Sequence, residues 1–300
     1  MAIVDEIERI KTNIENAYTE IENKGVITTG VKNSDNLAST ISAIQTGGTG
    51  GGSEITKGVI INECDSDGYP IDVSVVGMTS IPTNYFYYSA SPNGLLSKVG
   101  SNWHLPNDLT SIGDYAFYSC TKMTIDKLPD SITSIGTYAF SGCSNLKLTS
   151  LPSNLTTIGS YAFNSSNLPI TSLPDGLTSI GSNAFNYAYN FNITTVPVGV
   201  TVIPSYCFYS CDKLTELTLL GNITKIDTYA FQLCSKLTRL VLPNVTSVPT
   251  LSNKNAFSNT PFNNGYGGIY VPDSLLESFK SASNWSNFAA RIRALSTLEG

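Results

Sequence analysis

Three apolar positions recur along this 300-residue chain at a nearly constant interval. From Phe117 to Phe231, a phenylalanine that mostly follows alanine returns every 22 or 23 residues, and weaker copies lie at Phe86 and Phe257. An isoleucine stands five residues before each phenylalanine up to Phe231, and a leucine or valine, mostly followed by proline, stands seven residues earlier in most repeats. A unit of about 23 residues buries its apolar face only by stacking on its neighbours. The pattern therefore predicts a repeat solenoid of about eight turns over residues 80–272, with these three positions pointing inward.

Short alternating pieces within the repeats have the period of two that a half-buried strand requires. Residues 214–219 and 237–242 show this period most clearly. A proline that follows the strand prevents it from continuing, and clusters of Gly, Asn, Ser and Asp supply the turns. We expect successive turns to pair these short strands in parallel, at a spacing of about 4.8 Å.

The first 46 residues carry a different pattern, in which isoleucine returns at intervals of four and three residues. This heptad spacing predicts a helical segment over residues 1–46 that anchors or oligomerises the chain, and isoleucine at both core positions favours a trimer. The predicted oligomerisation contacts are Ile3, Ile7, Ile10, Ile14 and Ile21. In the alternative, this helix folds back on a second helix over residues 35–44 of the same chain. Three heptads are short for an independent coiled coil, so the sequence leaves both arrangements open.

The repeats have a predicted cap at each end. Residues 47–53 are mostly glycine and predict a flexible linker that leads into the first cap. Residues 54–79 alternate and predict a β-hairpin, whereas residues 273–300 place apolar side chains at the spacing of an amphipathic helix. Both caps protect the open ends of the solenoid, because exposed strand edges invite aggregation.

Two repeats share a motif that resembles a known family. Residues 109–120 read LTSIGDYAFYSC, and residues 132–143 read ITSIGTYAFSGC. They resemble the BspA-type leucine-rich repeats, and the resemblance extends over residues 80–272. Two later turns depart from the motif, with Ser166 and Ala188 in place of the cysteine. The resemblance implies a solenoid of the leucine-rich-repeat type with an adhesive or ligand-binding role, in bacterial surface proteins or in phage structural proteins, and it implies no catalysis.

The flanks resemble segments of bacteriophage proteins. The opening, at residues 7–18 and again at 33–38, is similar to the N-termini of tail-associated or fibre proteins, and residues 269–280 are similar to a segment that ends such repeat proteins. The charged start lacks the apolar core of a secretion signal, and no run is long enough to span a membrane. We therefore expect a virion structural protein of a tail, baseplate or fibre, made in the host cytoplasm, without membrane insertion. The alternative is a bacterial surface adhesin or protein-interaction module.

The partners expected for such a protein are further copies of itself, other virion proteins through the N-terminus, and a glycan or protein of the host surface.

The chain is 41% hydrophobic but only 13% charged, which is typical of an ordered protein with a polar surface. Its net charge of −6 argues against nucleic acid, which is bound mainly through Lys and Arg.

Candidate catalytic and metal-binding residues are scarce in the sequence. His104 is the single histidine, so a histidine-based metal cluster is excluded and a structural role is expected. Residues 65–68 resemble the start of a calcium loop, but Val76 stands where the bidentate glutamate belongs, which favours a plain turn. We therefore predict that the chain is not an enzyme and uses no metal and no cofactor.

Six cysteines are present, and we expect them to be reduced because a chain of this size needs no disulfide staples. Four of them stand three residues after the repeated phenylalanine, where a small side chain fills the interior: Cys120, Cys143, Cys211 and Cys234.

A series of tyrosines, named here the tyrosine ladder, is the candidate ligand-binding surface. The residue two before the repeated phenylalanine is a tyrosine in five repeats, and Asn183 interrupts the series. The ladder consists of Tyr115, Tyr138, Tyr161, Tyr206 and Tyr229. Each lies beside an inward position, so we expect it to face solvent, where an apolar ring with a polar tip suits sugars and proteins. Stacked identical side chains also stabilise a solenoid by packing alone, and the sequence does not decide between these roles.

Overall fold

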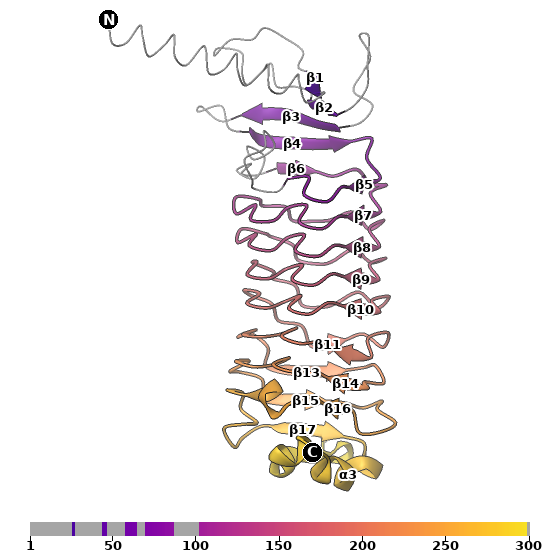
Figure 1. Ribbon diagram of the computed structural model, residues 1–300, viewed down its shortest axis with the longest axis vertical. Coiled ribbons are helices and arrows are strands. Elements are labelled where there is room, and N and C mark those ends of the chain that lie inside the picture. Colours follow the sequence, from indigo (N-terminus) through magenta and orange to yellow (C-terminus); the bar gives the residue numbers. More distant parts are fainter. Residues whose placement is uncertain (1–25, 28–43, 47–57, 65–69, 87–101, 299–300) are drawn as a thin grey trace, which may run out of the picture.

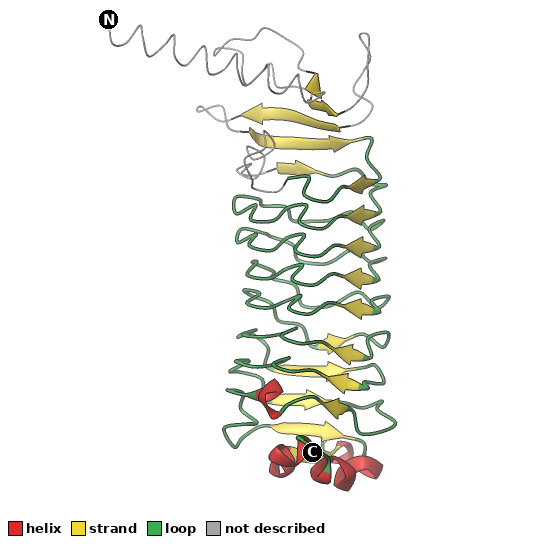
Figure 2. Ribbon diagram, viewed as in Figure 1, coloured by secondary structure: helices red, strands yellow, loops and turns green. Residues whose placement is uncertain are grey.

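The computed structural model describes residues 26–27, 44–46, 58–64, 70–86 and 102–298, which form a rod of stacked coils (Figure 1). Each coil passes once around the rod and lies against the coil before it, so the chain advances steadily from one end to the other. Strands and turns dominate, and the helices gather near the C-terminal end (Figure 2). The predicted repeat solenoid with short parallel strands is confirmed.

The described strands form four sheets. The first, in the order β1-β2-β3-β4-β6, comprises β1 Val26–Ile27, β2 Ile44–Thr46, β3 Gly58–Cys64, β4 Pro70–Val76 and β6 Asn102–His104. The second, β10-β9-β8-β7-β5, comprises β5 Ser80–Ile81, β7 Ser111–Ile112, β8 Ser134–Ile135, β9 Thr157–Ile158 and β10 Ser179–Ile180. The third, β11-β13-β15-β17-β18, comprises β11 Thr195–Val196, β13 Glu216–Leu219, β15 Arg239–Val241, β17 Gly268–Val271 and β18 Ile292–Ala294. The fourth, β12-β14-β16, comprises β12 Val202–Ile203, β14 Lys225–Ile226 and β16 Thr250–Leu251.

One edge of the rod consists of two-residue strands that keep the same register from coil to coil. Ile135 of β8 faces Ile112 of β7 on one side and Ile158 of β9 on the other. These isoleucines are buried, whereas the serine or threonine before each is exposed or partly exposed. The hydroxyl of Thr133 donates to the carbonyl oxygen of Thr110 at 3.2 Å, so side chains as well as backbone join successive coils. The isoleucine register predicted from the sequence is confirmed.

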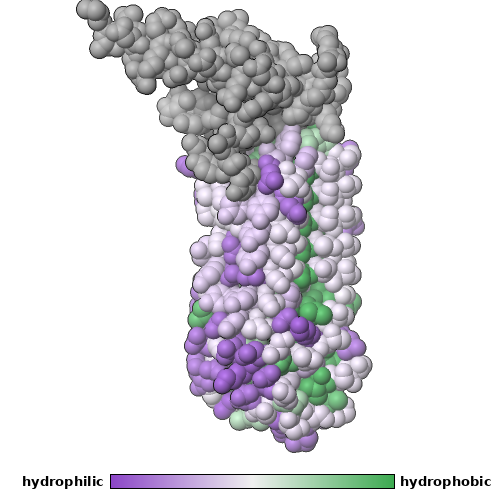
Figure 3. All heavy atoms as spheres, in the orientation of Figure 1, coloured by the Kyte–Doolittle hydropathy of each residue, from purple (hydrophilic) through white to green (hydrophobic). Residues whose placement is uncertain are grey.

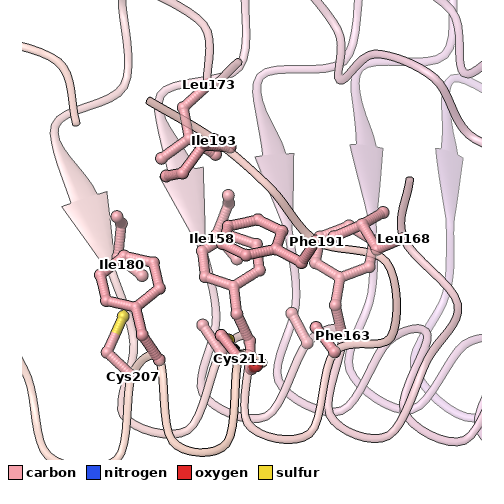
Figure 4. Packing of buried hydrophobic residues seen from close by; sticks show 14 of the residues in the cluster. Ile158, Phe163, Leu168, Leu173, Ile180, Phe191, Ile193, Cys207 and Cys211 are labelled. Atoms are coloured by element: carbon pink, nitrogen blue, oxygen red, sulfur yellow. Dashed lines mark hydrogen bonds between the residues drawn. The ribbon is translucent and has the colours of Figure 1, made fainter. Parts of the chain in front are cut away.

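The repeated phenylalanines form a continuous stack inside the rod. From Phe86 to Phe257 each is fully buried, and successive ring centroids lie 4.9–6.0 Å apart. Phe191 joins the stack, 4.5 Å from Phe185 and 5.9 Å from Phe208. Figure 4 shows part of this core, in which apolar side chains from neighbouring coils point toward one another. Burial of each such ring contributes about 1.5–3 kcal/mol, so this stack is a main source of stability.

Glycine follows the isoleucine where coils approach most closely. A Cβ on Gly159 would lie 2.5 Å from the carbonyl carbon of Gly136 in the preceding coil. At Gly181 it would lie 2.6 Å from the carbonyl carbon of Gly159 and closer still to the backbone nitrogen of Ser160. Any side chain here would push the coils apart, because the atoms it meets belong to backbone.

A second set of strands appears in the C-terminal half of the rod. Arg239 of β15 lies between Glu216 of β13 and Gly268 of β17, and Val241 lies between Thr218 and Tyr270. Strands β13 and β15 confirm the alternating segments predicted at residues 214–219 and 237–242, although each strand is shorter than its pattern.

At the N-terminal end, β3 and β4 pair antiparallel, as the alternation over residues 54–79 predicts. The isoleucines of the predicted heptads and the linker at residues 47–53 lie outside the described residues. Ile44, the last residue of the predicted second helix, lies instead in β2, where pairing with Val59 of β3 satisfies its backbone groups.

The C-terminal cap contains less helix than its apolar spacing predicts. The 3-10 segments are η3 Lys254–Phe257 in the last coil, then η4 Asp273–Leu275, η5 Trp285–Arg291 and η6 Leu295–Thr297. The α-helix α3 is limited to Leu276–Ser281, and Ile292 pairs with Ile269 as part of strand β18. The prediction of a helix is therefore wrong for Ile292–Ala294. These residues form a strand because pairing with the open edge of β17 satisfies the backbone groups of both strands. Trp285 fixes the cap to the last coil, since its Nε1 donates to the carbonyl oxygen of Pro249 at 2.8 Å.

Candidate functional site

The five tyrosines of the ladder are partly exposed and occupy equivalent places in successive coils. In each, the backbone adopts a left-handed conformation with φ between 55° and 63°. The backbone N–H of Tyr138 donates to the carbonyl oxygen of Ser160 in the next coil at 2.8 Å, which holds this geometry. The sequence pattern correctly places these residues beside the inward phenylalanines, but it contains no signal for the sign of φ apart from asparagine at Asn84 and Asn183.

The left-handed backbone makes tyrosine an unexpected residue at these positions. The conformation costs a residue other than glycine about 1–2 kcal/mol, and asparagine and aspartate tolerate it best among the rest. Asn84 and Asn183 follow this preference, with φ of 59° each. The five tyrosines do not, so contacts of the side chain must offset the backbone strain.

The first three ladder residues form one stack. The ring centroids of Tyr115 and Tyr138 lie 4.7 Å apart, and those of Tyr138 and Tyr161 lie 4.4 Å apart, with interplanar angles of 15° and 5°. Tyr118 packs at an angle against Tyr115 and Tyr138. Burial by the neighbouring rings raises the pKa of Tyr138, and the phenol groups of Tyr161 and Tyr115 raise it further.

The last two ladder residues form a second stack. The centroids of Tyr206 and Tyr229 lie 4.7 Å apart at an interplanar angle of 34°. Tyr209 packs against Tyr206 and meets Tyr187 edge to face. The hydrogen bond with Tyr187, followed by burial, raises the pKa of Tyr209. Three tyrosines that do not keep the ladder register, Tyr118, Tyr187 and Tyr209, thus widen both stacks.

Asn183 separates the two stacks. Its side chain is buried, and its Oδ1 accepts a hydrogen bond from the Nδ2 of Asn186 at 3.0 Å. Beside this interruption Tyr187 and Tyr189 are 42% and 54% exposed, which makes them the most accessible tyrosines of the central coils. The candidate surface is therefore two aromatic patches with a polar gap, and not one continuous ladder.

Stacking determines which part of each ring a partner can reach. The inner ring of the first stack, Tyr138, has a neighbouring ring on each face. A sugar therefore cannot lie flat on it, and what the stack presents outward is ring edges and phenol groups. This geometry suits contacts with a protein surface, for which tyrosine is a preferred residue.

The cysteines take part in the core and not in the candidate surface. Cys143 donates from Sγ to the carbonyl oxygen of Phe117 at 3.0 Å, and Cys234 donates to that of Phe208 at 2.9 Å. Burial raises the pKa of Cys120 and of Cys234 to about 12, so both thiols stay protonated. Cys120, Cys143, Cys211 and Cys234 are all buried and form no disulfide, which confirms the packing role predicted for this register.

Other sequence-predicted features fall in different parts of the molecule. His104 ends strand β6 and is exposed. Within the described ranges, no three His, Cys, Asp or Glu side chains are grouped closely enough to hold a metal ion. None of the helices in that part of the chain is both long and apolar enough to cross a membrane. Residues 65–68 and the five isoleucines predicted to oligomerise are not among the described residues.

Comparison with known proteins shows a family match along most of the rod. The family described as "BspA type Leucine rich repeat region" matches residues 79–196 and 157–275, in six copies. No curated protein matches the chain.

Among solved structures, a leucine-rich repeat protein from Bacteroides ovatus is 31% identical, with a TM-score of 0.51, and the match covers 60% of this chain and 45% of that one. The chain thus spans less than half the length of this relative. A leucine-rich repeat protein of T. pallidum is 25% identical, with a TM-score of 0.41 over 62% of this chain and 84% of its own. A leucine-rich cell surface protein from Faecalibacterium prausnitzii is 17% identical, with a TM-score of 0.27 over 83% and 95%.

Proposed function

Because the chain belongs to the BspA-type leucine-rich repeat family, we propose that it is an adhesive protein displayed at a bacterial surface, whose tyrosine stacks bind a protein partner. We also propose that the chain is not an enzyme. Burial of the thiols in protonated form agrees with this, since the thiolate is the reactive species.

The observation that carries the proposal is the recurrence of tyrosine at a left-handed backbone position. Asparagine occupies the same position at Asn84 and Asn183, so the fold itself accepts a smaller polar residue there. Five tyrosines at this position, each partly exposed, create an aromatic surface that the backbone does not require. Strained residues that recur on a surface support a functional role, and tyrosine is enriched where proteins bind one another.

The test replaces Tyr138 and Tyr161 together by asparagine in the full chain. Asparagine keeps the left-handed backbone, so the double variant should fold, while the first aromatic stack is removed. Labelled protein is measured by flow cytometry on panels of animal and bacterial cells, with and without protease treatment of the cells. We expect binding that protease abolishes and that the double variant weakens about tenfold or more, the effect of losing an interface hot spot.

Tyr189→Asn is the matched control, because Tyr189 is 54% exposed but belongs to neither stack. It should bind as the unmodified chain does. Binding that survives the double substitution in a folded protein would show that the first stack serves packing alone.

A bacteriophage virion is the second setting in which such a surface would serve attachment to a host. The feature that favours it is the heptad pattern of residues 1–21, with a trimer as the expected assembly. Light scattering on the full chain and on a version that begins at Glu54 tests this: a trimer that becomes a monomer on truncation supports a fibre. Monomers in both cases count against the fibre and leave the surface adhesin. Binding to bacterial cells in the panel above, rather than to animal cells, is the outcome that the virion setting predicts.

A further inference from the structure

Cationic side chains gather on the sheet near the C-terminal end of the rod. Hydrophilic residues cluster there over the beginnings of β13, β15 and β17 (Figure 3). The cations of β15 and β18 and of the segments directly before β13, β15 and β18 are named here the basic face: Lys213, Lys236, Arg239, Arg291 and Arg293. All are exposed except Arg291, which is partly buried.

The parallel register brings these residues together from distant parts of the sequence. Arg239 of β15 lies opposite Gly268 of β17, and Arg293 of β18 lies opposite Tyr270 of β17. Arg291 ends η5, directly before β18, and its Nη2 lies 3.9 Å from where a Cβ on Gly265 would be, in the turn that leads into β17. Since neighbouring strands lie about 4.8 Å apart, Arg239 and Arg293, on the two strands that flank β17, lie about 10 Å apart across the sheet and are offset by two residues along it.

Tyr270 lies at the centre of the basic face. Its ring covers Gly268, because a Cβ on that glycine would lie 2.8–3.1 Å from the ring atoms and the phenol oxygen. The guanidinium carbon of Arg293 lies over the ring, 6.0 Å from its centroid. An aromatic ring that lies against the sheet, flanked by guanidinium groups, differs from the mutually stacked rings of the tyrosine ladder.

Charge on this face is opposite in sign to that of the whole chain. The chain carries a net charge of −6, whereas the basic face gathers five cations, with Glu216 paired to Arg239 and Asp212 next to Lys213 in the sequence. Among the described residues, Glu216 is the carboxylate that pairs with one of these cations, at 2.8 Å from Arg239, and both partners are about half exposed. Such a surface pair contributes little to stability, so Arg239 can exchange Glu216 for a carboxylate of a ligand.

We propose that the basic face binds an anionic glycan, namely a polysaccharide whose sugar rings carry carboxylates. The planar guanidinium groups of Arg239, Arg291 and Arg293 match carboxylates in geometry and form short, charge-assisted hydrogen bonds with them. Tyr270 supplies an apolar contact for the carbon atoms of a sugar ring. Lys213 and Lys236, one in each of two successive coils, extend the positive charge along the rod.

The number and setting of the cations favour a glycan over a nucleic acid. Nucleic acids derive affinity from many phosphate contacts, and the negative charge of the rest of this chain opposes a long polyphosphate. A glycan that carries one carboxylate per ring has a lower charge density, which three arginines and two lysines can neutralise locally.

The experiment measures binding of a short oligogalacturonate to the full chain by calorimetry at low and at physiological salt. Its methyl ester, which has the same rings without the charge, is the matched ligand. We expect the acid to bind and the ester to bind at least about tenfold more weakly, with affinity for the acid falling as salt increases. The double variant Arg291→Gln, Arg293→Gln should weaken binding about tenfold or more, and Tyr270→Leu should also weaken it.

Lys254→Gln removes one exposed positive charge from η3, outside the basic face, and should leave binding unchanged. The proposal is overturned if the ester binds as well as the acid, if Lys254→Gln weakens binding as much as the arginine variant, or if a single-stranded oligonucleotide of equal charge binds more tightly. No measurable binding of the acid also overturns it. The Tyr138→Asn, Tyr161→Asn variant should bind the oligogalacturonate normally, which separates this site from the tyrosine ladder.

Discussion

Substitution of one glycine between two coils tests how closely the coils must approach. In Gly181→Ala, the added methyl group would lie 2.6 Å from the carbonyl carbon of Gly159 and would also collide with the backbone of Ser160. Neither neighbour can rotate away, because both atoms are backbone. The coils must therefore separate locally, which lengthens the hydrogen bond from the N–H of Gly181 to the carbonyl oxygen of Ile158, now 2.8 Å.

The expected loss of stability has three parts. Overpacking of this kind costs about 1–3 kcal/mol. Weakened hydrogen bonds on either side of the glycine add about 1 kcal/mol each. Alanine also restricts the unfolded chain, which offsets about 0.4–1 kcal/mol of this loss of stability. We therefore expect Gly181→Ala to lower the free energy of unfolding by about 3 kcal/mol, a factor of more than one hundred in the folding equilibrium.

Gly176→Ala in the same coil is the matched control. A Cβ there would meet nothing closer than the carbonyl oxygen of Leu155 at 4.0 Å, and the glycine does not have a positive φ. This variant should be unchanged or slightly more stable, by about 0.4–1 kcal/mol.

Both variants are compared with the unmodified chain by urea denaturation, followed by circular dichroism and tryptophan fluorescence. A solenoid need not unfold in a single step, so agreement of the two probes is checked before free energies are derived. If Gly181→Ala is no less stable than Gly176→Ala, the close approach of the coils does not constrain the sequence, and the reasoning is wrong.

Three further predictions concern the core and the C-terminal cap. Phe163→Ala should destabilise the rod by about 3–5 kcal/mol in urea titrations, because a fully buried ring of the stack is lost. Trp285→Phe keeps a ring but leaves the carbonyl oxygen of Pro249 unpaired, so the same assay should show a loss of about 1–3 kcal/mol. The thiols of Cys120 and Cys234, whose pKa burial raises to about 12 from 9.0, should not react with an aromatic disulfide reagent until the protein unfolds. Because the fold favours their protonated form, the stability that they provide is complete below pH 9.0 and is lost as pH rises toward 12, which denaturation at several alkaline pH values measures.

The inward positions could be predicted from the sequence because burial and periodicity are linked directly. A phenylalanine at Phe140 and an isoleucine at Ile135 recur in every neighbouring coil, and only a stacked arrangement buries them all. The ladder positions were also predictable in place, as neighbours of the phenylalanines. Their left-handed backbone was not, because hydrophobic patterning contains no information about φ, and only Asn84 and Asn183 pointed to it.

Two features depend on pairing between segments that are distant in the sequence, so the local sequence pattern does not predict them. Ile292 fits a helix by its spacing from Phe288, yet the unpaired edge of β17 provides a partner that makes it part of a strand. The basic face is another example, since Arg239 and Arg293 are more than fifty residues apart in sequence and flank β17 only through the register of the sheet. The net charge of the chain, which argues against polyanions, does not reveal such a local excess.

The direction of the hydrogen bonds between coils has a mechanical consequence. Bonds such as that from the N–H of Phe117 to the carbonyl oxygen of Ala139, at 2.8 Å, join one coil to the next along the rod. A pulling force between the two ends therefore loads these interfaces in series, so each carries the same force and the weakest opens first. Each released coil of about 23 residues adds up to about 80 Å of extended chain. A rod of this design should lengthen in steps under tension, which limits the force that it transmits from one end to the other.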